Sequence, residues 1–168
     1  MGVLGYTWAM EWSDQGIVLS ARRHGEAAAI VTLLTPDHGR HAGLVRGGAG
    51  RRQRGVLQPG NRVAARWRAR LAEHLGTLTC ELTEAMAAPH LADPLRLAGL
   101  SAACALADWA LPEREPHVAI HDGLLHLIKS LSGDDWPFFY VIWEVDLLRE
   151  LGFGLDLVGV IVAAGALL

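Results

Sequence analysis

The sequence of 168 residues predicts an α+β protein, in which a small five-stranded β-barrel precedes a helical domain. Two observations carry this prediction. Between Gly16 and Leu82, short apolar segments are separated by turns that contain glycine and proline, which is typical of small antiparallel barrels. After Asp93 the apolar residues recur instead at helical spacing, between proline and glycine stops.

The composition is that of a folded protein. Hydrophobic residues make up 51% of the chain and the formal net charge is −3, which predicts a well-filled core. The two cysteines, Cys80 and Cys104, are too few for a disulfide framework or a four-thiolate zinc site, so we expect buried, reduced thiols. Residues 1–9 have neither a basic start nor a long apolar run. We expect them to be an extension before a natural start at Met10, in a cytoplasmic protein.

Residues 10–84 are expected to form the barrel. Pro36 and Gly39 occupy the positions that a tight turn between two strands requires. An earlier turn is expected over 22–25. Five short strands with such turns fit an oligonucleotide-binding (OB) type of barrel, with an SH3-like barrel as the alternative. The expected strands are 16–21, 27–35, 40–46, 62–71 and 77–82.

The fourth expected strand has the clearest pattern. From Arg62 to Leu71, arginines alternate with apolar residues that include Trp67. Because successive side chains of a strand point to opposite faces, the arginines share an outer face and Trp67 points inward. A solvated outer face is the simpler interpretation. The absence of any acid between His38 and Ala72 favours a phosphate-binding surface instead.

Basic residues are concentrated in one window of the chain. Residues 39–71 hold nine of the fifteen Lys and Arg residues and no acid, so the window carries +9; the rest, with six basic and eighteen acidic residues, carries −12. Such polarity indicates an anionic polymer as the partner. The predicted phosphate contacts are Arg40, Arg46, Arg51, Arg52, Arg54, Arg62, Arg66, Arg68 and Arg70.

The segment 47–55 joins the third and fourth expected strands. Its sequence, GGAGRRQRG, is too rich in glycine to predict an ordered element. We expect a flexible basic loop that becomes ordered on a phosphate backbone, and a disordered basic linker is the alternative. It is not a Walker-type loop, because no Gly-Lys-Ser/Thr follows it.

Residues 85–168 are expected to form the helical domain. Asp93 followed by Pro94 is an N-cap with proline at the first helical position, and the helix should run to Trp109. A second helix is expected from Pro116, and a third from 134–137 to Gly152.

The third helix is apolar on more than one side. One set has regular helical spacing, while Trp143 and Leu147 lie on another side. Residues 158–168 are uncharged and apolar to the end of the chain. We therefore expect self-association with Trp143, Leu147 and residues 158–168 at the contact. The regularly spaced set is Phe138, Val141, Ile142, Val145 and Leu148.

No pattern predicts an active site, so we expect no catalytic residue, no cofactor and no metal. Asp37, His38 and His41 have a metal-like spacing, but side chains diverge in a turn that enters a strand, and a polar turn is preferred. Three further histidines are expected on a partly exposed helix face: His117, His121 and His126.

With these features in place, the sequence resembles the RecO family of bacterial recombination mediators. The resemblance rests on EWSDQG (11–16), RHGE (23–26), TPDHGRHAGLVR (35–46), LQPGN (57–61), AEHLGT (72–77) and ELGFGLDL (150–157), in that order. It implies an OB-type barrel followed by a helical domain, without bond-making chemistry. It also implies binding of single- and double-stranded DNA, annealing of complementary strands, and loading of recombinase, with RecR, on DNA coated by single-strand-binding protein (SSB) in the RecF pathway.

The sequence departs from the family pattern after residue 157. Family members continue there with further helices, and some carry a four-cysteine zinc cluster that this sequence lacks. We therefore expect an incomplete helical domain, which weakens the expectation of a contact to the acidic, aromatic-ended SSB tail.

Three other functions fit parts of the pattern. An RNA-binding barrel of translation or RNA processing would use the same phosphate contacts. An enzyme would use Asp37, His38 and His41. An interaction module would bind an acidic protein with its basic face.

Overall fold

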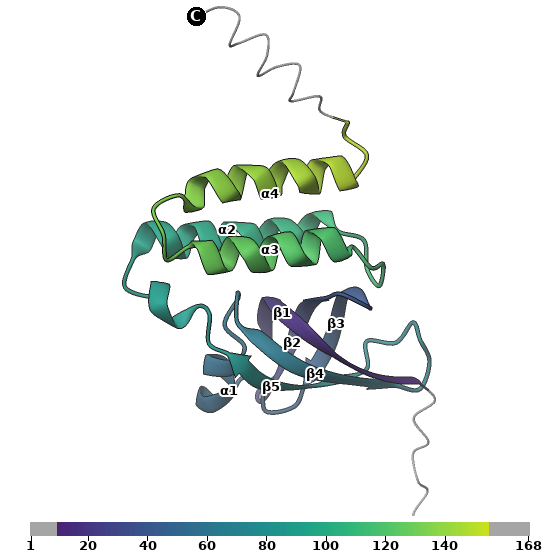
Figure 1. The fold of residues 1–168 in the computed structure, drawn as a ribbon. Coiled ribbons are helices and arrows are strands. Elements are labelled where there is room, and N and C mark those ends of the chain that lie inside the picture. The colour runs from purple at the N-terminus through teal and green to yellow at the C-terminus, as the bar shows by residue number, and fades with distance from the viewer. Residues whose placement is uncertain (1–9, 155–168) are drawn as a thin grey trace, which may run out of the picture.

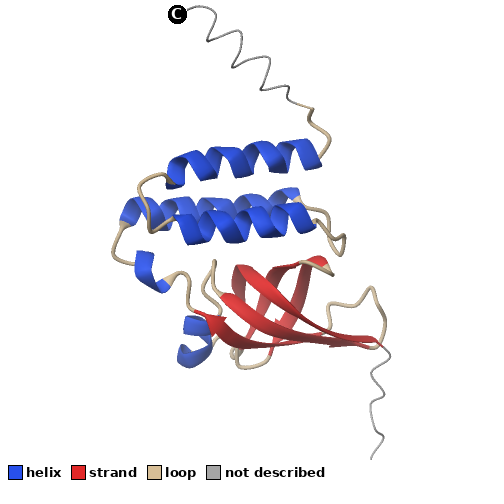
Figure 2. Ribbon diagram, in the orientation of Figure 1, coloured by secondary structure: helices blue, strands red, loops and turns tan. Residues whose placement is uncertain are grey.

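The computed structural model describes residues 10–154 (Figure 1). The predicted extension, residues 1–9, and the apolar segment 158–168 lie outside the described residues. Strands gather at one end of the molecule and three long helices at the other (Figure 2). The elements are β1 (Met10–His24), β2 (Ala28–Thr35), β3 (Gly39–Val45), α1 (Arg51–Val56), β4 (Arg62–Ala69), β5 (Thr77–Glu84), the 3₁₀ turn η1 (Ala88–His90), α2 (Pro94–Ala110), α3 (Val118–Ser130) and α4 (Trp136–Glu150).

The five strands form a closed barrel in the order β1-β2-β3-β5-β4, and β4 pairs back onto β1. Every pairing is antiparallel except that of β3 with β5, which meet in parallel at Leu44 and Thr77. The predicted fold class, an OB-type barrel followed by helices, is confirmed. Among residues 10–154, no helix is both long and apolar enough to traverse a lipid bilayer.

Strand β1 is much longer than the predicted strand 16–21, because it pairs with two other strands. Its first half pairs with β4, from Met10 opposite Ala69 onwards, and its second half pairs with β2, ending at His24 opposite Ala28. The sequence EWSDQ in the first half is mostly polar and partly exposed, so no apolar run marked it as a strand. This first half closes the barrel beside the arginines of β4.

The prediction of a flexible loop over 47–55 was wrong, because the segment contains α1. Leu57 anchors the end of this short helix in the barrel core, at 2% exposure. Gly48 packs so closely on β2 that an added Cβ would lie 2.8 Å from the Cβ of Ala29. The glycines therefore permit a tight approach to the barrel rather than disorder.

Two apolar clusters hold the molecule together. One fills the barrel, with Leu33, Val63 and Trp67 among its members. The other joins the barrel to the helices, since Ile17 and Leu34 pack with residues of α2, α3 and α4. Cys80 lies in the first cluster and Cys104 in the second, both as the buried free thiols that were predicted. Burial raises the pKa of each thiol to about 12.

The orientation of α4 is the opposite of the one predicted. Trp143 and Leu147 are buried, at 2% and 4% exposure, and the Trp143 Nε1–H donates to the Ile120 carbonyl at 3.3 Å. The self-association contact predicted at these two residues is therefore wrong. Helical spacing could not distinguish the two sides, because both are apolar. The exposed apolar residues of α4 are Phe138, Val141, Ile142 and Leu148.

Two arginines fasten the barrel to the loop that precedes α3. Arg40 of β3 donates to the Leu111 carbonyl at 2.7 Å and to Asp108 at 3.2 Å. Arg114 donates its backbone N–H to the Arg40 carbonyl at 2.8 Å and its guanidinium to the His74 carbonyl at 2.7 Å. Gly39 lies directly beneath this loop, where a side chain would collide with the backbone of Glu115.

Candidate nucleic-acid interface

The outer face of β4 carries two of the predicted arginines. The predicted alternation is confirmed: Val63, Ala65, Trp67 and Ala69 are buried, while Arg66 and Arg68 point outward. The Arg66 side chain is 52% exposed and that of Arg68 is 34% exposed. Trp67 is fixed inside the barrel, where its Nε1–H donates to the Leu75 carbonyl at 2.9 Å.

An acidic residue lies against these two arginines. Glu11 of β1 stands opposite Arg68 in the strand ladder, and its Oε2 lies 3.0 Å from the Arg68 Nε. Its other oxygen accepts from the Arg66 guanidinium. The hydrogen bond from Arg66, followed by the positive charges of both arginines, lowers the pKa of Glu11. The interpretation that no acid balances the stripe was therefore wrong, because the acid comes from outside the basic window.

A groove follows this face of the barrel. It has a volume of about 580 Å³ and is open to solvent. Three strands line it: β1 supplies Ser13, Asp14 and Gln15, β4 supplies the two arginines, and β5 supplies Thr79 and Glu81. The two guanidinium groups and the donors of Ser13, Gln15 and Thr79 suit a sugar-phosphate backbone, while Glu81 and Glu11 place carboxylates on the same face. We call this feature the β4 groove.

Four other exposed arginines of the predicted set lie at a different end of the barrel. Arg46 lies in the turn after β3, and the remaining three predicted residues of this group belong to α1. Arg23, near the end of β1, borders the same place, because it lines a pocket of about 310 Å³ with Arg54 and Ala49. We call this feature the basic pole, formed by Arg23, Arg46, Arg51, Arg52 and Arg54.

The basic pole is built by contacts between loops. The Ala49 N–H donates to the Ala27 carbonyl at 3.0 Å, which ties the turn before α1 to the turn between β1 and β2. Arg23 donates to the carbonyls of Gly25 and Glu26, at 3.2 and 3.0 Å. All five arginines of the basic pole are exposed, and none has an acidic side chain within 4.0 Å among residues 10–154.

Arg23 was missed from the sequence because it lies outside the basic window. The signal that could have found it is the adjacent pair of arginines at the β1–β2 turn, since a hairpin turn and a neighbouring basic loop can meet at one end of a barrel.

The three remaining predicted arginines are not part of either surface. Arg40 is half-buried and held by the helical part through Asp108, Glu113 and the Leu111 carbonyl. Arg62 is half-buried at the start of β4, opposite Ile17 and Glu84. Arg70 is exposed just beyond the end of β4. The nine arginines that the sequence groups together therefore occupy separate places on the barrel.

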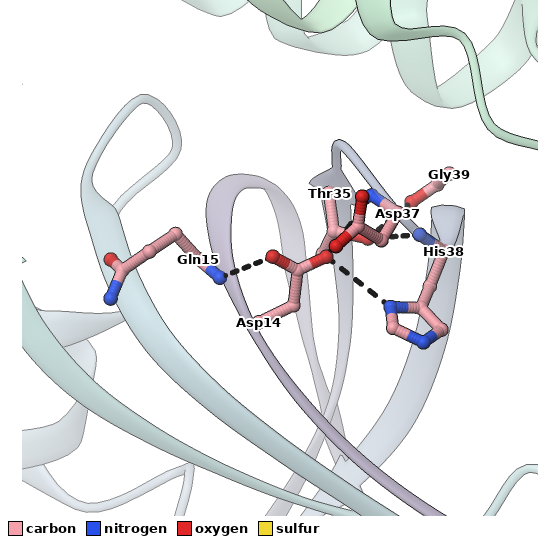
Figure 3. A network of polar contacts seen from close by, with 6 residues as sticks. All are labelled: Asp14, Gln15, Thr35, Asp37, His38 and Gly39. Atoms are coloured by element: carbon pink, nitrogen blue, oxygen red, sulfur yellow. Dashed lines mark hydrogen bonds and ion pairs between the residues drawn. The ribbon is translucent and has the colours of Figure 1, made fainter.

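A polar network fixes the turn between β2 and β3 (Figure 3). The Asp14 carboxylate lies 3.2 Å from His38 Nδ1 and accepts the backbone N–H groups of Asp37, at 3.1 Å, and Gln15, at 2.7 Å. The Thr35 hydroxyl accepts the His38 backbone N–H at 3.1 Å. The His38 ring is thus held in one orientation by its neighbours.

The histidines do not converge on a common centre. His41 is buried at 5% exposure, and burial lowers its pKa to about 4, with the charges of Arg114 and His38 acting in the same direction. Among residues 10–154, no three His, Cys, Asp or Glu residues are grouped so that they could hold a metal ion.

The prediction of a partly exposed face was wrong for His117 and His121. Both are buried, at 8% and 4% exposure, and their Nδ1 atoms lie 3.0 Å from Glu150 and 2.9 Å from Asp122. The third histidine of that group, His126, is exposed, and its ring packs edge-on against Phe139.

Comparison with known proteins gives two family matches and a consistent set of relatives. The family model "Recombination protein O N terminal" matches residues 10–86, and "Recombination protein O C terminal" matches residues 91–159. The chain is 64% identical over 147 residues to the DNA repair protein RecO of Rhodospirillum centenum, covering 88% of this chain and 59% of that relative. It is 53% identical over 154 residues to RecO of Rhodospirillum rubrum, covering 88% and 61%.

A third relative, the DNA repair protein RecO of Cereibacter sphaeroides, is 50% identical over 148 residues, with 88% of this chain and 62% of the relative covered. The chain thus spans about three fifths of the length of the curated relatives that it matches. The two models describe recombination protein O, abbreviated RecO, and the relatives are each named DNA repair protein RecO; the models together match most of the chain, barrel and helices alike. The chain therefore belongs to the RecO family of DNA repair and recombination proteins.

Proposed function

We propose that this chain is a DNA-binding accessory protein of recombinational repair, which holds DNA by its phosphates on the surface of the barrel. The observation that carries the proposal is the basic pole. Five exposed arginines lie there on three neighbouring segments of the chain, without an acidic partner among the described residues, and two of them, Arg23 and Arg54, line one pocket. Guanidinium groups are well suited to phosphate, because they donate two parallel hydrogen bonds to its oxygens.

The β4 groove supplies a second contact surface in this proposal. Its lining residues and those of the pocket at the basic pole have no member in common, so the two surfaces are separate. A protein with two such surfaces can hold two strands at once. This arrangement supports annealing of complementary single strands as the activity of the chain.

The wider role follows from the family. We propose that the chain helps to load recombinase on SSB-coated DNA in the RecF pathway, with RecR and the SSB tail as protein partners. It would do so in the cytoplasm, by binding and without making or breaking covalent bonds. The support for this role is the family membership and the printed name of the relatives, DNA repair protein RecO.

Self-association is also proposed, through the exposed apolar side of α4. Phe138 and Val141 are 64% and 57% exposed, and Val141 borders an open apolar hollow of about 330 Å³ with Leu95 and Trp136. Exposed apolar surface of this kind usually marks a protein contact. A second copy of the chain is the partner that this proposal names.

An annealing assay tests the proposed activity. Two complementary labelled oligonucleotides should pair faster in the presence of the chain, and the double variant Arg51→Ala/Arg52→Ala should lose most of that acceleration. The matched control, Lys129→Ala/Arg149→Ala, removes the same charge from the helical part and should behave as wild type. Equal loss in both variants would contradict a role for the basic pole. Competition between single-stranded DNA and RNA of equal length separates DNA binding from the RNA-binding alternative.

A further inference from the structure

Trp109, near the end of α2, is the most exposed Trp, Phe or Tyr among residues 10–154, at 92% exposure. Another side of α2 holds the helix to the barrel, where Leu100 and Ala107 pack in the same cluster as Leu19 of β1. Tryptophan is on average a well-buried residue, because its indole has a large apolar surface. Almost none of this indole is covered, so the fold does not depend on it.

Trp109 borders an open hollow between α2 and β1, with a volume of about 360 Å³. Ser101 and Ala105 line the same hollow, because residues four and eight positions before Trp109 lie on the same side of a helix. Both are small, which leaves space beside the indole. Arg22 of β1 lines the hollow as well. We call this feature the α2 hollow.

The α2 hollow adjoins the pocket of the basic pole, because Ala21 and Pro59 line both. Pro59 belongs to a loop that is fixed on both sides. Leu57 is buried in the barrel core, and Gly60 lies so close to α2 that an added Cβ would be 2.6 Å from the Cδ1 of Leu100. The two pockets therefore form one continuous surface across this loop.

The charges along this surface favour phosphate. Arg23 and Arg54 line the pocket of the basic pole, and Arg22 lines the α2 hollow. All three are exposed, and none forms an ion pair among residues 10–154. Asp108 also lines the α2 hollow, but its side chain is only 14% exposed and its Oδ1 already lies 3.2 Å from the Nη1 of Arg40.

Building on the proposed function, we propose that Trp109 is a stacking platform for an unpaired base of single-stranded DNA whose phosphates lie on Arg22 and the basic pole. Unpaired bases stack on aromatic side chains irrespective of sequence, whereas the bases of a duplex are already stacked on one another. The arginines attract either form of DNA. Trp109 adds affinity only where a base is free, so the chain prefers single strands.

The test measures the affinity of the full chain for three probes by fluorescence anisotropy. The probes are an oligothymidylate, an abasic oligonucleotide of the same length, and a duplex. The wild-type chain should bind the oligothymidylate about tenfold more tightly than the abasic strand, in line with the stacking of one base. Trp109→Ala should lose about tenfold on the oligothymidylate, remain unchanged on the other two probes and melt at the wild-type temperature.

Two further variants complete the test. Trp109→Phe keeps a flat ring and should stay within about threefold of wild type on every probe. Phe153→Ala is the matched control, because it removes an aromatic residue of 62% exposure that lines neither pocket. It should bind all three probes as the wild-type chain does.

Equal affinity of the wild-type chain for the oligothymidylate and the abasic strand would overturn base stacking without relying on any variant. An equal loss on all three probes in Trp109→Ala would also overturn it, because stacking cannot act on the abasic strand. Unchanged binding of the oligothymidylate in Trp109→Ala, with a lower apparent mass in light scattering, would make Trp109 a protein contact instead. Each of these results leaves DNA binding by the arginines in place. If the wild-type chain bound none of the probes, the proposed function itself would fail.

Discussion

The Oε2 of Glu11 lies 3.0 Å from the Nε of Arg68, so the outer face of β4 carries its own counter-charge. The carboxylate also engages Arg66, which leaves both guanidinium groups oriented but partly neutralised. A phosphate that enters the β4 groove must share these arginines with Glu11 or displace it. The basic pole has no competing carboxylate among the described residues. It should therefore attract phosphate more strongly than the β4 groove does.

Removing this competitor should strengthen DNA binding. We expect Glu11→Gln to raise the affinity for single-stranded DNA by about twofold to fivefold at low salt, because exposed ion pairs are weak and easily exchanged. Asp146→Asn is the control, since Asp146 is also paired with an exposed arginine, Arg149, but lies on α4. The measurement is anisotropy at low and high salt. Unchanged or weaker binding in Glu11→Gln would mean that the carboxylate only orders the arginines.

The two faces of β4 should respond differently to truncation. Trp67→Ala removes a side chain at 2% exposure together with its hydrogen bond to Leu75, and should cost about 3–5 kcal/mol in the free energy of unfolding. Arg66→Ala/Arg68→Ala should melt close to wild type and bind DNA less tightly. Urea titration with parallel binding curves checks both. A Trp67→Ala chain of normal stability would show that the barrel core does not depend on this ring.

The difference between what the sequence predicts and what it leaves open is clear on β4 itself. The period of two is local, so the inward position of Trp67 and the outward position of Arg66 followed from the chain alone. The pairing with Glu11 depends on the register of β1 against β4, which no local pattern contains. The position of Arg23 in the basic pole could not be predicted for the same reason, because it depends on contacts between segments that are distant in sequence.

The helical part shows a second limit. Trp143 and Val141 are both apolar and lie on different sides of α4, so spacing alone could not tell which side packs on α3.

The glycine-rich segment before α1 shows a third limit of prediction from the sequence. Glycine permits both disorder and close packing, and only the neighbouring β2 decides between them at Gly48.

His41 should make stability depend on pH. Burial lowers its pKa from 6.5 to about 4, so the unfolded chain binds a proton on this residue that the folded chain does not, between those two pH values. The free energy of unfolding should therefore fall as the pH drops from about 6.5 towards 4. In His41→Phe the free energy of unfolding should decrease less over this pH range, because the variant lacks the group whose pKa differs between the folded and unfolded chain. Chemical denaturation at a series of pH values measures the slopes. Equal slopes would place the pH dependence on other groups.

The exposed side of α4 should control self-association. Phe138→Ser/Val141→Ser replaces two exposed apolar side chains and should lower the apparent mass in light scattering without lowering the melting temperature. Trp143→Ala is the contrasting variant, because it empties a buried site and should lower the melting temperature. A wild-type chain that is monomeric at high concentration would contradict this prediction.

The salt dependence of DNA binding tests the central claim most directly, because each phosphate neutralised on a single strand contributes about −0.7 to the slope of log affinity against log salt. Engagement of the basic pole, Arg23, Arg46, Arg51, Arg52 and Arg54, predicts a contribution of about −3.5 to the slope of the wild-type chain, to which the two arginines of the β4 groove add. Arg51→Ala/Arg52→Ala should make the slope shallower by about 1.4, while Lys129→Ala/Arg149→Ala should leave it unchanged. A wild-type slope near zero, or an equal change in both variants, would contradict DNA binding through the basic pole.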